Sequence, residues 1–325
     1  MSAQTLGVKS LGSRFKLSGG GSGILIALIV LIAALGLASP RFLSLGNLTD
    51  ITRQAVFVAI IAFGATLVIA MRGIDLSVGS TLAFTGLIAA DLMNRGFNPF
   101  ASVAASLAAG TLIGIVNGVL VAKVKIADFI VTMAMMVMTR GLIMVYTEGI
   151  PLTGLSNPTF QMFGQGFVWL VPMPVLITIV TFLAIYFLLY QTRFGRYTLS
   201  IGSNPEAARL VGIRIDHIKI TVYALTGFLA ALSGVLLTSR LEAAMPEAGE
   251  GYELDVIAAV VMGGTSLAGG KASLLGTAAG AILMAVVRNG LNILNVNTFW
   301  HQVVIGAIIL MAVCADKFGG RLKEA

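Results

Sequence analysis

The sequence AVFVAIIAFGATLVIAM (residues 55–71) contains no charged side chain and lies between Arg53 and Arg72. An α-helix needs about 20 apolar residues to cross the hydrocarbon core of a bilayer, so this run is typical of a transmembrane helix. Similar runs lie on either side of it, at residues 24–39, 76–93, 100–122, 129–146, 168–190, 218–238, 254–267, 274–294 and 300–315. The sequence therefore predicts an all-α fold, a polytopic transmembrane bundle of about ten helices.

The composition agrees with this class of protein. The chain is 57% hydrophobic and 11% charged, whereas soluble domains are about 25% charged. With two His and one Cys the chain cannot build a Cys/His zinc cluster, so no metal or cofactor is expected. We expect a cytoplasmic tail at residues 1–23, one transmembrane domain at 24–315 and a second cytoplasmic tail at 316–325. The first run also fits a cleaved signal peptide, and we favour an uncleaved anchor.

The basic residues indicate how the bundle is oriented. Of the 21 Lys and Arg residues, fifteen fall on the side of the N-terminus and five on the opposite side, while Arg140 lies inside a predicted span. Cytoplasmic loops of membrane proteins carry an excess of Lys and Arg, which places both termini in the cytoplasm. The net charge of +7 is then explained by the excess of basic residues in the cytoplasmic loops and tails. Because these charges are spread over small loops without stacking aromatic residues, no nucleic-acid partner is expected.

The cytoplasmic loop at residues 191–217 contains the signals of a short helix. Asn204 is a suitable N-cap and Pro205 a suitable first helical residue. Glu206 falls in the first turn and Arg209 near the end, where each charge favours the helix dipole. Gly212 is then a stop signal. A two-turn surface helix is predicted, either as a connecting helix or as a docking element.

No energy source is visible in the chain. The glycine-rich stretch 263–272 (GGTSLAGGKA) lacks the spacing of a phosphate-binding loop, because Thr265 replaces the first glycine and Ala272 follows Lys271. A tight cytoplasmic turn is the favoured interpretation. An ion-coupled secondary carrier stays an alternative, with Asp75 and Asp128 as its only nearby acids. A membrane enzyme is less well supported, because the two histidines lie in separate segments.

A few polar residues within the apolar runs are candidates for a translocation pathway. They are Asp75, Ser77, Asn117, Arg140, Asn289 and Asn292. A charge at Arg140 would cost roughly 2.5–3.5 kcal/mol in lipid, so this side chain should find a partner, in a salt bridge or along the pathway. Asp75 belongs to GIDLSVGS (residues 73–80), either as a break lining a cavity or as a helix cap. The asparagines also fit hydrogen bonds between helices.

Two further patterns concern contacts of the bundle. Gly110, Gly114 and Gly118 recur every four residues, a spacing that lets helices approach closely within one subunit or between two. The acidic stretch at residues 240–253 is expected to be an outer loop. It is therefore a candidate contact for a partner protein outside the membrane.

Four segments resemble one known family. They are GIDLSVGS (73–80), RGLIMVY (140–146), residues 193–214, and YELDVIAAVVMGGTSLAGGK (252–271). Over nearly its full length the chain resembles the sugar-type permeases of ATP-binding cassette (ABC) importers, in the branched-chain amino acid/sugar permease superfamily, whose fold is that of type II importers. Glu206, Ala207, Ala208 and Gly212 match the EAA-x3-G motif of the loop that meets the ATPase in such importers.

The resemblance implies a permease of the bacterial inner membrane that has no ATPase site of its own. It implies two cytoplasmic ATPase subunits, a periplasmic sugar-binding protein and a second permease subunit, in a homodimer or a paired permease. Transport would follow alternating access without chemical change to a monosaccharide. Ribose is the favoured sugar, while permeases for xylose, arabinose, galactose, allose or a furanosyl signal molecule look alike at this level.

Overall fold

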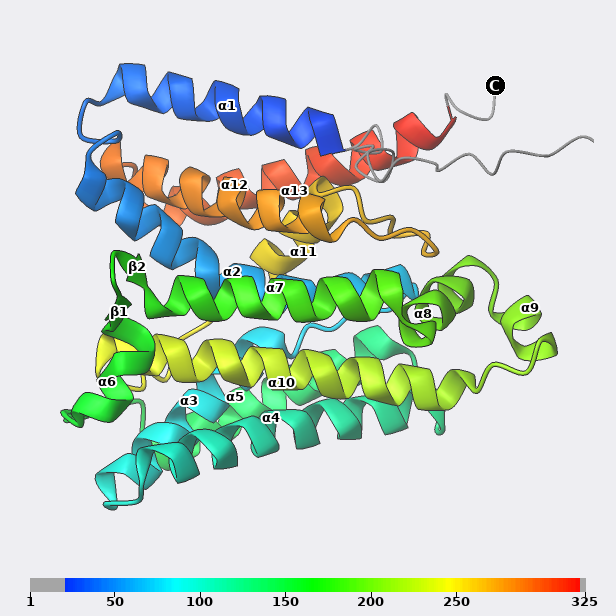
Figure 1. Cartoon of the computed structure of the whole chain (residues 1–325), viewed down its shortest axis with the longest axis horizontal. Helices are drawn as coiled ribbons and strands as arrows, with labels where there is room; N and C mark the ends of the chain where they lie inside the picture. The colour runs from blue at the N-terminus through cyan, green and yellow to red at the C-terminus, as the bar shows by residue number, and fades with distance from the viewer. Residues whose placement is uncertain (1–20, 322–325) are drawn as a thin grey trace, which may run out of the picture.

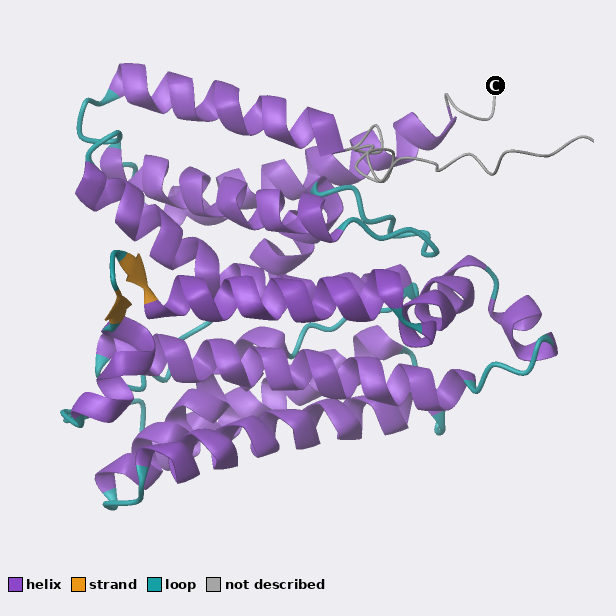
Figure 2. Cartoon of the chain, in the orientation of Figure 1, coloured by secondary structure: helices purple, strands orange, loops and turns teal. Residues whose placement is uncertain are grey.

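The computed structural model describes residues 21–321, and this part of the chain is almost entirely helical (Figure 2). Its helices are α1 (Gly21–Ala38), α2 (Leu45–Ala70), α3 (Val78–Asn94), α4 (Pro99–Ala122), α5 (Asp128–Thr147), α6 (Pro158–Gln165), α7 (Met173–Gln191), α8 (Arg193–Ser203), α9 (Pro205–Leu210), α10 (Ile215–Leu241), α11 (Tyr252–Met262), α12 (Leu274–Ile293) and α13 (Thr298–Arg321). The strands β1 (Phe167–Val168) and β2 (Val171–Pro172) form a small antiparallel hairpin. Residues 1–20 and 322–325 of the predicted tails lie outside the described residues.

Six helices are long and apolar enough to cross a membrane: α2, α4, α5, α7, α10 and α12. Every one of the ten predicted apolar runs falls on a helix, since α1, α3, α11 and α13 carry the remaining four. The prediction of an all-α, polytopic membrane bundle is therefore confirmed. The count of ten crossings stays a prediction.

The centre of the bundle is α2, against which α7, α10, α11 and α12 pack. In the most apolar 18-residue window of α2, 89% of the residues are buried, against 22% for α5 and for α7. The outer helices therefore keep apolar faces free for lipid or for a second subunit.

The repeated glycines of α4 allow a close contact with α10. A Cβ atom built on Gly110 would lie 2.6 Å from the carbonyl oxygen of Gly227, and one on Gly118 would lie 2.7 Å from the Cα atom of Ile220. Both partners belong to α10 of the same chain. The predicted close packing is thus found within one subunit.

The helix α11 is shorter than a membrane crossing, and here the predicted boundaries differ from the structure. The run 254–267 was expected as one span, but α11 has 11 residues, or about 16 Å, and ends where Gly263 and Gly264 begin a turn. The preceding segment, 242–251, is not a free outer loop either. Gly249 and Ala244 are buried, and Ala244 pairs with Leu152 through backbone hydrogen bonds in both directions. This segment folds back into the bundle before α11 begins.

The ends of the bundle carry different elements (Figure 1). The helices α8 and α9, the turn between α11 and α12, and the last residues of α13 lie at one end, while α6 and the β hairpin lie at the other. Segments that the charge pattern assigns to the cytoplasm thus share one end. Which end faces the cytoplasm stays a prediction.

Candidate functional site

The short helix α9 has the caps that its sequence predicts. The side-chain oxygen of Asn204 accepts a hydrogen bond from the backbone N–H of Ala207 at 3.1 Å, and Pro205 occupies the first helical position. Gly212 has a φ of +82°, and the N–H of the next residue, Ile213, bonds the carbonyl of Ala208 at 3.1 Å. These bonds satisfy backbone groups that both ends of a helix leave open. The predicted helix and the left-handed Gly212 are confirmed, so α9 is short and rigidly capped.

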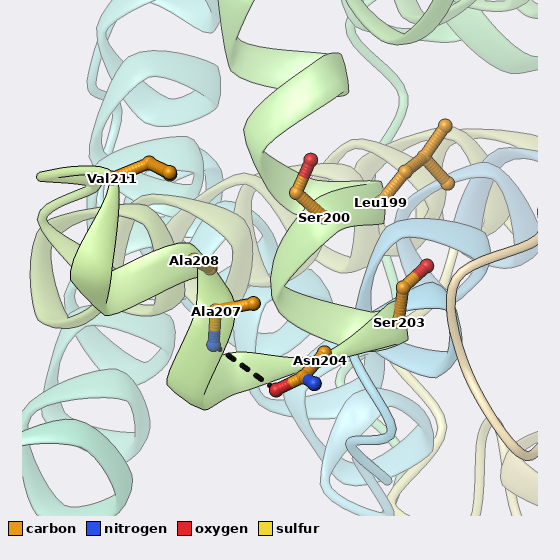
Figure 3. Close-up of a pocket in the computed structure, with 7 residues that line it drawn as sticks. All are labelled: Leu199, Ser200, Ser203, Asn204, Ala207, Ala208 and Val211. Atoms are coloured by element: carbon orange, nitrogen blue, oxygen red, sulfur yellow. Dashed lines mark hydrogen bonds between the residues drawn. The ribbon is translucent and has the colours of Figure 1, made fainter.

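A hollow of about 380 Å³ separates α9 from α8 (Figure 3). Its lining residues are Leu199, Ser200, Ser203, Asn204, Ala207, Ala208 and Val211. At the end of α9, Leu210 and Val211 are 88% and 76% exposed. Exposed apolar side chains beside a hollow are typical of a surface that binds another protein.

A second candidate site surrounds the break between α2 and α3. The carboxylate of Asp75 accepts hydrogen bonds from the backbone N–H and the hydroxyl of Ser77, at 2.9 and 2.7 Å. The side-chain amide of Asn117, on α4, donates to the same hydroxyl at 2.9 Å. All three side chains are buried, and the oxygen of the Asn117 amide has no partner among the described residues. The structure thus brings together three of the six predicted pathway residues.

The backbone of the break is also held by α5. Asp128, the first residue of α5, accepts a hydrogen bond from the N–H of Ile74 at 2.6 Å, and the hydroxyl of Thr132 donates to the carbonyl of Ile74 at 3.3 Å. A non-helical segment between apolar helices needs such partners, because no water satisfies its backbone groups there. The carboxylate of Asp128 therefore stabilises the backbone of the break at Ile74.

Arg140 lies on α5 about two helix turns beyond Thr132. Its Nη1 atom donates to the carbonyl oxygens of Pro246 and Ala248, at 2.8 and 2.9 Å. Arg140 thus has the partner that we expected. The prediction that this partner would be an acidic side chain is wrong for the described residues, because Arg140 bonds backbone carbonyls of the folded-back segment 242–251 instead. The guanidinium is half-buried, which leaves donors free on its open side.

Carboxylates gather near Arg140. A Cβ atom on Gly79, in the first turn of α3, would lie 2.6 Å from the Oε2 atom of Glu253, so the glycine makes room for that carboxylate. The exposed side chains of Glu247 and Glu250 lie on the same segment as the carbonyls that Arg140 holds. The site therefore combines a cation with several anions beside the α2–α3 break.

The other two pathway candidates lie elsewhere. Asn289, on α12, exchanges hydrogen bonds with Asn47 of α2 at 2.7 and 3.0 Å, which is the tie between helices that a lone asparagine often makes. Asn292 is exposed on the same helix. Neither residue joins Asp75, Ser77, Asn117 and Arg140.

One buried ion pair was missed from the sequence. Asp255 of α11 is fully buried, and its Oδ2 atom lies 2.7 Å from both Nε and Nη2 of Arg288 on α12. Its other carboxylate oxygen has no partner within the described residues. No pattern in the sequence marks these two residues as a pair, because 33 residues separate them.

Helices of this length, apolarity and number, with polar breaks inside the bundle, define a multi-pass membrane protein. The family described as "Branched-chain amino acid transport system / permease component" matches residues 47–313. The chain belongs to this family, and is a transport subunit in the bacterial inner membrane.

Curated relatives agree with that assignment. The chain is 49% identical to the ribose import permease protein RbsC of Escherichia coli (strain K12) over 295 residues, which is 90% of this chain and 92% of the relative. It is 44% identical to the ribose import permease protein RbsC of Haemophilus influenzae, covering 92% and 93% of the two chains. It is 37% identical to the L-arabinose ABC transporter permease protein AraH of Azospirillum brasilense, covering 94% and 89%. No solved structure matches the chain significantly. The resemblance found in the sequence is confirmed.

Proposed function

We propose that this chain is the permease subunit of an ABC importer that moves a monosaccharide, ribose, across the inner membrane. The observation that carries the proposal is the similarity to ribose import permeases over nine-tenths of the chain, which exceeds the similarity to an arabinose permease. The alternative substrates are xylose, arabinose, galactose, allose or a furanosyl signal molecule.

The energy would arrive through α9 from separate ATPase subunits. Coupling in trans needs an element whose contacts with the ATPase differ between two conformations of the permease. The capped helix from Asn204 to Gly212, with its exposed Leu210 and Val211, has the rigidity and the apolar surface for such a contact. The exposed Glu206, Ala207 and Arg209 would lie within this ATPase-binding surface. Ala208 is buried against Ile201 and Ile215 and would hold α9 in place beneath it.

The sugar would pass beside the break between α2 and α3, along the half-buried face of Arg140. A pentose offers hydroxyl groups that both donate and accept hydrogen bonds. Arg140 supplies donors in a fixed fork, and Glu253 supplies a carboxylate nearby. Asp75, Ser77 and Asn117 would hold the backbone of the break in place. Asn289 is not part of this proposed pathway, because it ties α12 to α2. Asn292 is not part of it either, because this residue is exposed on α12 away from the break.

The remaining partners follow from this type of transporter. A second permease subunit, as a homodimer or a paired permease, would complete the pore, with alternating access between its two sides. A periplasmic binding protein would deliver the sugar at the end that carries α6 and the β hairpin.

Assembly and sugar-dependent ATP hydrolysis test the proposal. The chain is co-expressed with its ATPase, and the purified complex is placed in liposomes with the sugar-binding protein. We expect the two subunits to copurify, and ribose-loaded binding protein to stimulate ATP hydrolysis more than binding protein offered arabinose, xylose, galactose or allose. A complex with the P-loop lysine of the ATPase replaced is the control. Equal stimulation with and without sugar would contradict the proposal.

The orientation has a separate test. In a background without Cys314, single cysteines replace Ser156, which lies in a loop, or Ser203, the last residue of α8. Both residues are exposed, and they lie on opposite sides of the predicted membrane. An impermeant thiol reagent added to intact cells should label Ser156→Cys and leave Ser203→Cys unlabelled until the cells are opened. Labelling of Ser203→Cys in intact cells would overturn the proposed ATPase contact.

A further inference from the structure

Three segments that are distant in sequence meet by backbone contact where α8 ends. The N–H of Gly270 donates to the carbonyl of Ala70 at 2.9 Å, and the Nη2 atom of Arg72 donates to the carbonyl of Ser203 at 2.9 Å. A Cβ atom on Gly202 would collide with the carbonyl oxygen of Ala70 and lie 2.6 Å from the nitrogen of Gly270. We call this contact the α2–α8 junction; its residues are Ala70, Arg72, Gly202, Ser203, Gly269 and Gly270.

Within the junction, the glycine-rich turn holds the end of α8 against the end of α2. Gly269 and Gly270 have φ values of +80° and +76°, and a Cβ atom on Gly269 would lie 2.6 Å from the carbonyl oxygen of Gly202. Side chains at these places would separate the turn from α8. Since the backbones touch, α8 cannot shift along the end of α2 without breaking the junction.

Arg72 occupies an unfavourable backbone conformation within the junction. Its φ is +67°, a left-handed value that a glycine adopts without steric strain and an arginine does not. A hydrogen bond from the N–H of Gly73 to the carbonyl of Val68, at 2.9 Å, closes the same turn. The fold therefore tolerates strain where a glycine would serve better, unless the side chain is needed.

The position of Arg72 connects both candidate sites. On one side its guanidinium bonds Ser203, the residue before Asn204, which caps α9. On the other side Ile74 follows after one glycine, and its backbone is held by Asp128 and Thr132 of α5, the helix that carries Arg140. A displacement of α9 would therefore be transmitted to the α2–α3 break and to α5 through the constrained backbone around Arg72.

We propose that Arg72 is a positioning residue that couples the α8–α9 pair to the α2–α3 break through the α2–α8 junction. This inference rests on the proposed function, because it assigns how the work of the ATPase reaches the sugar pathway. Spatial contact alone does not establish coupling, so the test must measure the coupling itself.

The test compares ribose uptake per ATP hydrolysed in the complete reconstituted complex. Arg72→Gly removes the guanidinium while relieving the strained φ, which separates the role of the side chain from that of the backbone. Lys125→Gly is the matched control, because Lys125 is also exposed, basic and left-handed at φ +64°, with no side-chain hydrogen bond in the described part of the chain. We expect Arg72→Gly to copurify with the ATPase and to hydrolyse ATP. Its ribose uptake per ATP should be about tenfold lower, which is close to the lower limit for losing one charge-assisted hydrogen bond. Lys125→Gly should match the parent, and Arg72→Lys should restore part of the ratio.

The opposite side of the junction gives a second variant. Gly202→Ala places a methyl group against Ala70 and should lower the same ratio without changing Arg72. The inference would be overturned if both Arg72→Gly and Gly202→Ala kept the parental uptake per ATP. It would also be overturned if Arg72→Gly failed to assemble while Gly202→Ala kept the parental uptake per ATP. These results leave the proposed function intact. That function fails separately if the parent complex shows no ATP-driven uptake.

Discussion

Replacing Arg140 by alanine should release the segment 242–251 from the bundle. The guanidinium donates to Pro246 and Ala248 at 2.8 and 2.9 Å, and hydrogen bonds to charged groups contribute about 1.5–3 kcal/mol each. Because Arg140 is half-buried, we take the lower end of this range. The two bonds together should then contribute about 3 kcal/mol, a factor of roughly 150 in the population of the folded-back segment.

This prediction can be measured without transport. Purified Arg140→Ala and parent protein are unfolded in mixed micelles of increasing denaturing detergent, and parallel samples receive a protease that cleaves after Glu247 and Glu250. The variant should be less stable by about 3 kcal/mol and be cleaved faster in this segment. Arg140→Lys, which keeps the charge, should fall between the two proteins. A stability change below about 0.5 kcal/mol with unchanged cleavage would show that Arg140 does not hold the segment.

Further changes test the other contacts. Arg288→Ala leaves the buried carboxylate of Asp255 unpaired and should lower the free energy of unfolding by about 3 kcal/mol. In a double-mutant cycle, Asp255→Asn combined with Arg288→Gln should recover part of this lost stability. Additive effects of the two substitutions would contradict the ion pair. Gly114→Val places a side chain against Tyr223 of α10 and should reduce the folded yield, measured by size-exclusion chromatography; a normal yield would contradict the close helix contact. Gly212→Val and Glu206→Lys should leave the chain in the membrane and weaken copurification with the ATPase or uncouple hydrolysis from uptake; normal copurification and coupling in both would place the ATPase contact elsewhere.

Local signals in the sequence predicted local structure well. Asn204, Pro205 and Gly212 predicted the start and the end of α9 because each acts on backbone groups a few residues away. The apolar runs predicted the helices because the bilayer demands length and apolarity from each span separately. The four-residue glycine spacing on α4 likewise predicted a close helix contact, although not its partner.

Features made by distant segments were not predictable in this way. Hydropathy places residues 242–251 outside the membrane. It depends on the composition of each segment alone, so it does not detect that this segment folds back against α3 and α5. The partners of Arg140 are backbone carbonyls, which every residue carries, so no side-chain pattern marks them. Asp255 and Arg288 are joined only by the packing of α11 on α12.

The central claim is that this chain moves a sugar only when a separate ATPase supplies the energy. Its most direct test is uptake of radiolabelled ribose into proteoliposomes that contain the chain alone, with an imposed proton or sodium gradient, or the chain with ATPase, ATP and sugar-binding protein. We expect no uptake by the chain alone under either gradient and accumulation of ribose in the complete system with ATP. Gradient-driven accumulation by the chain alone would contradict this account and identify an ion-coupled carrier.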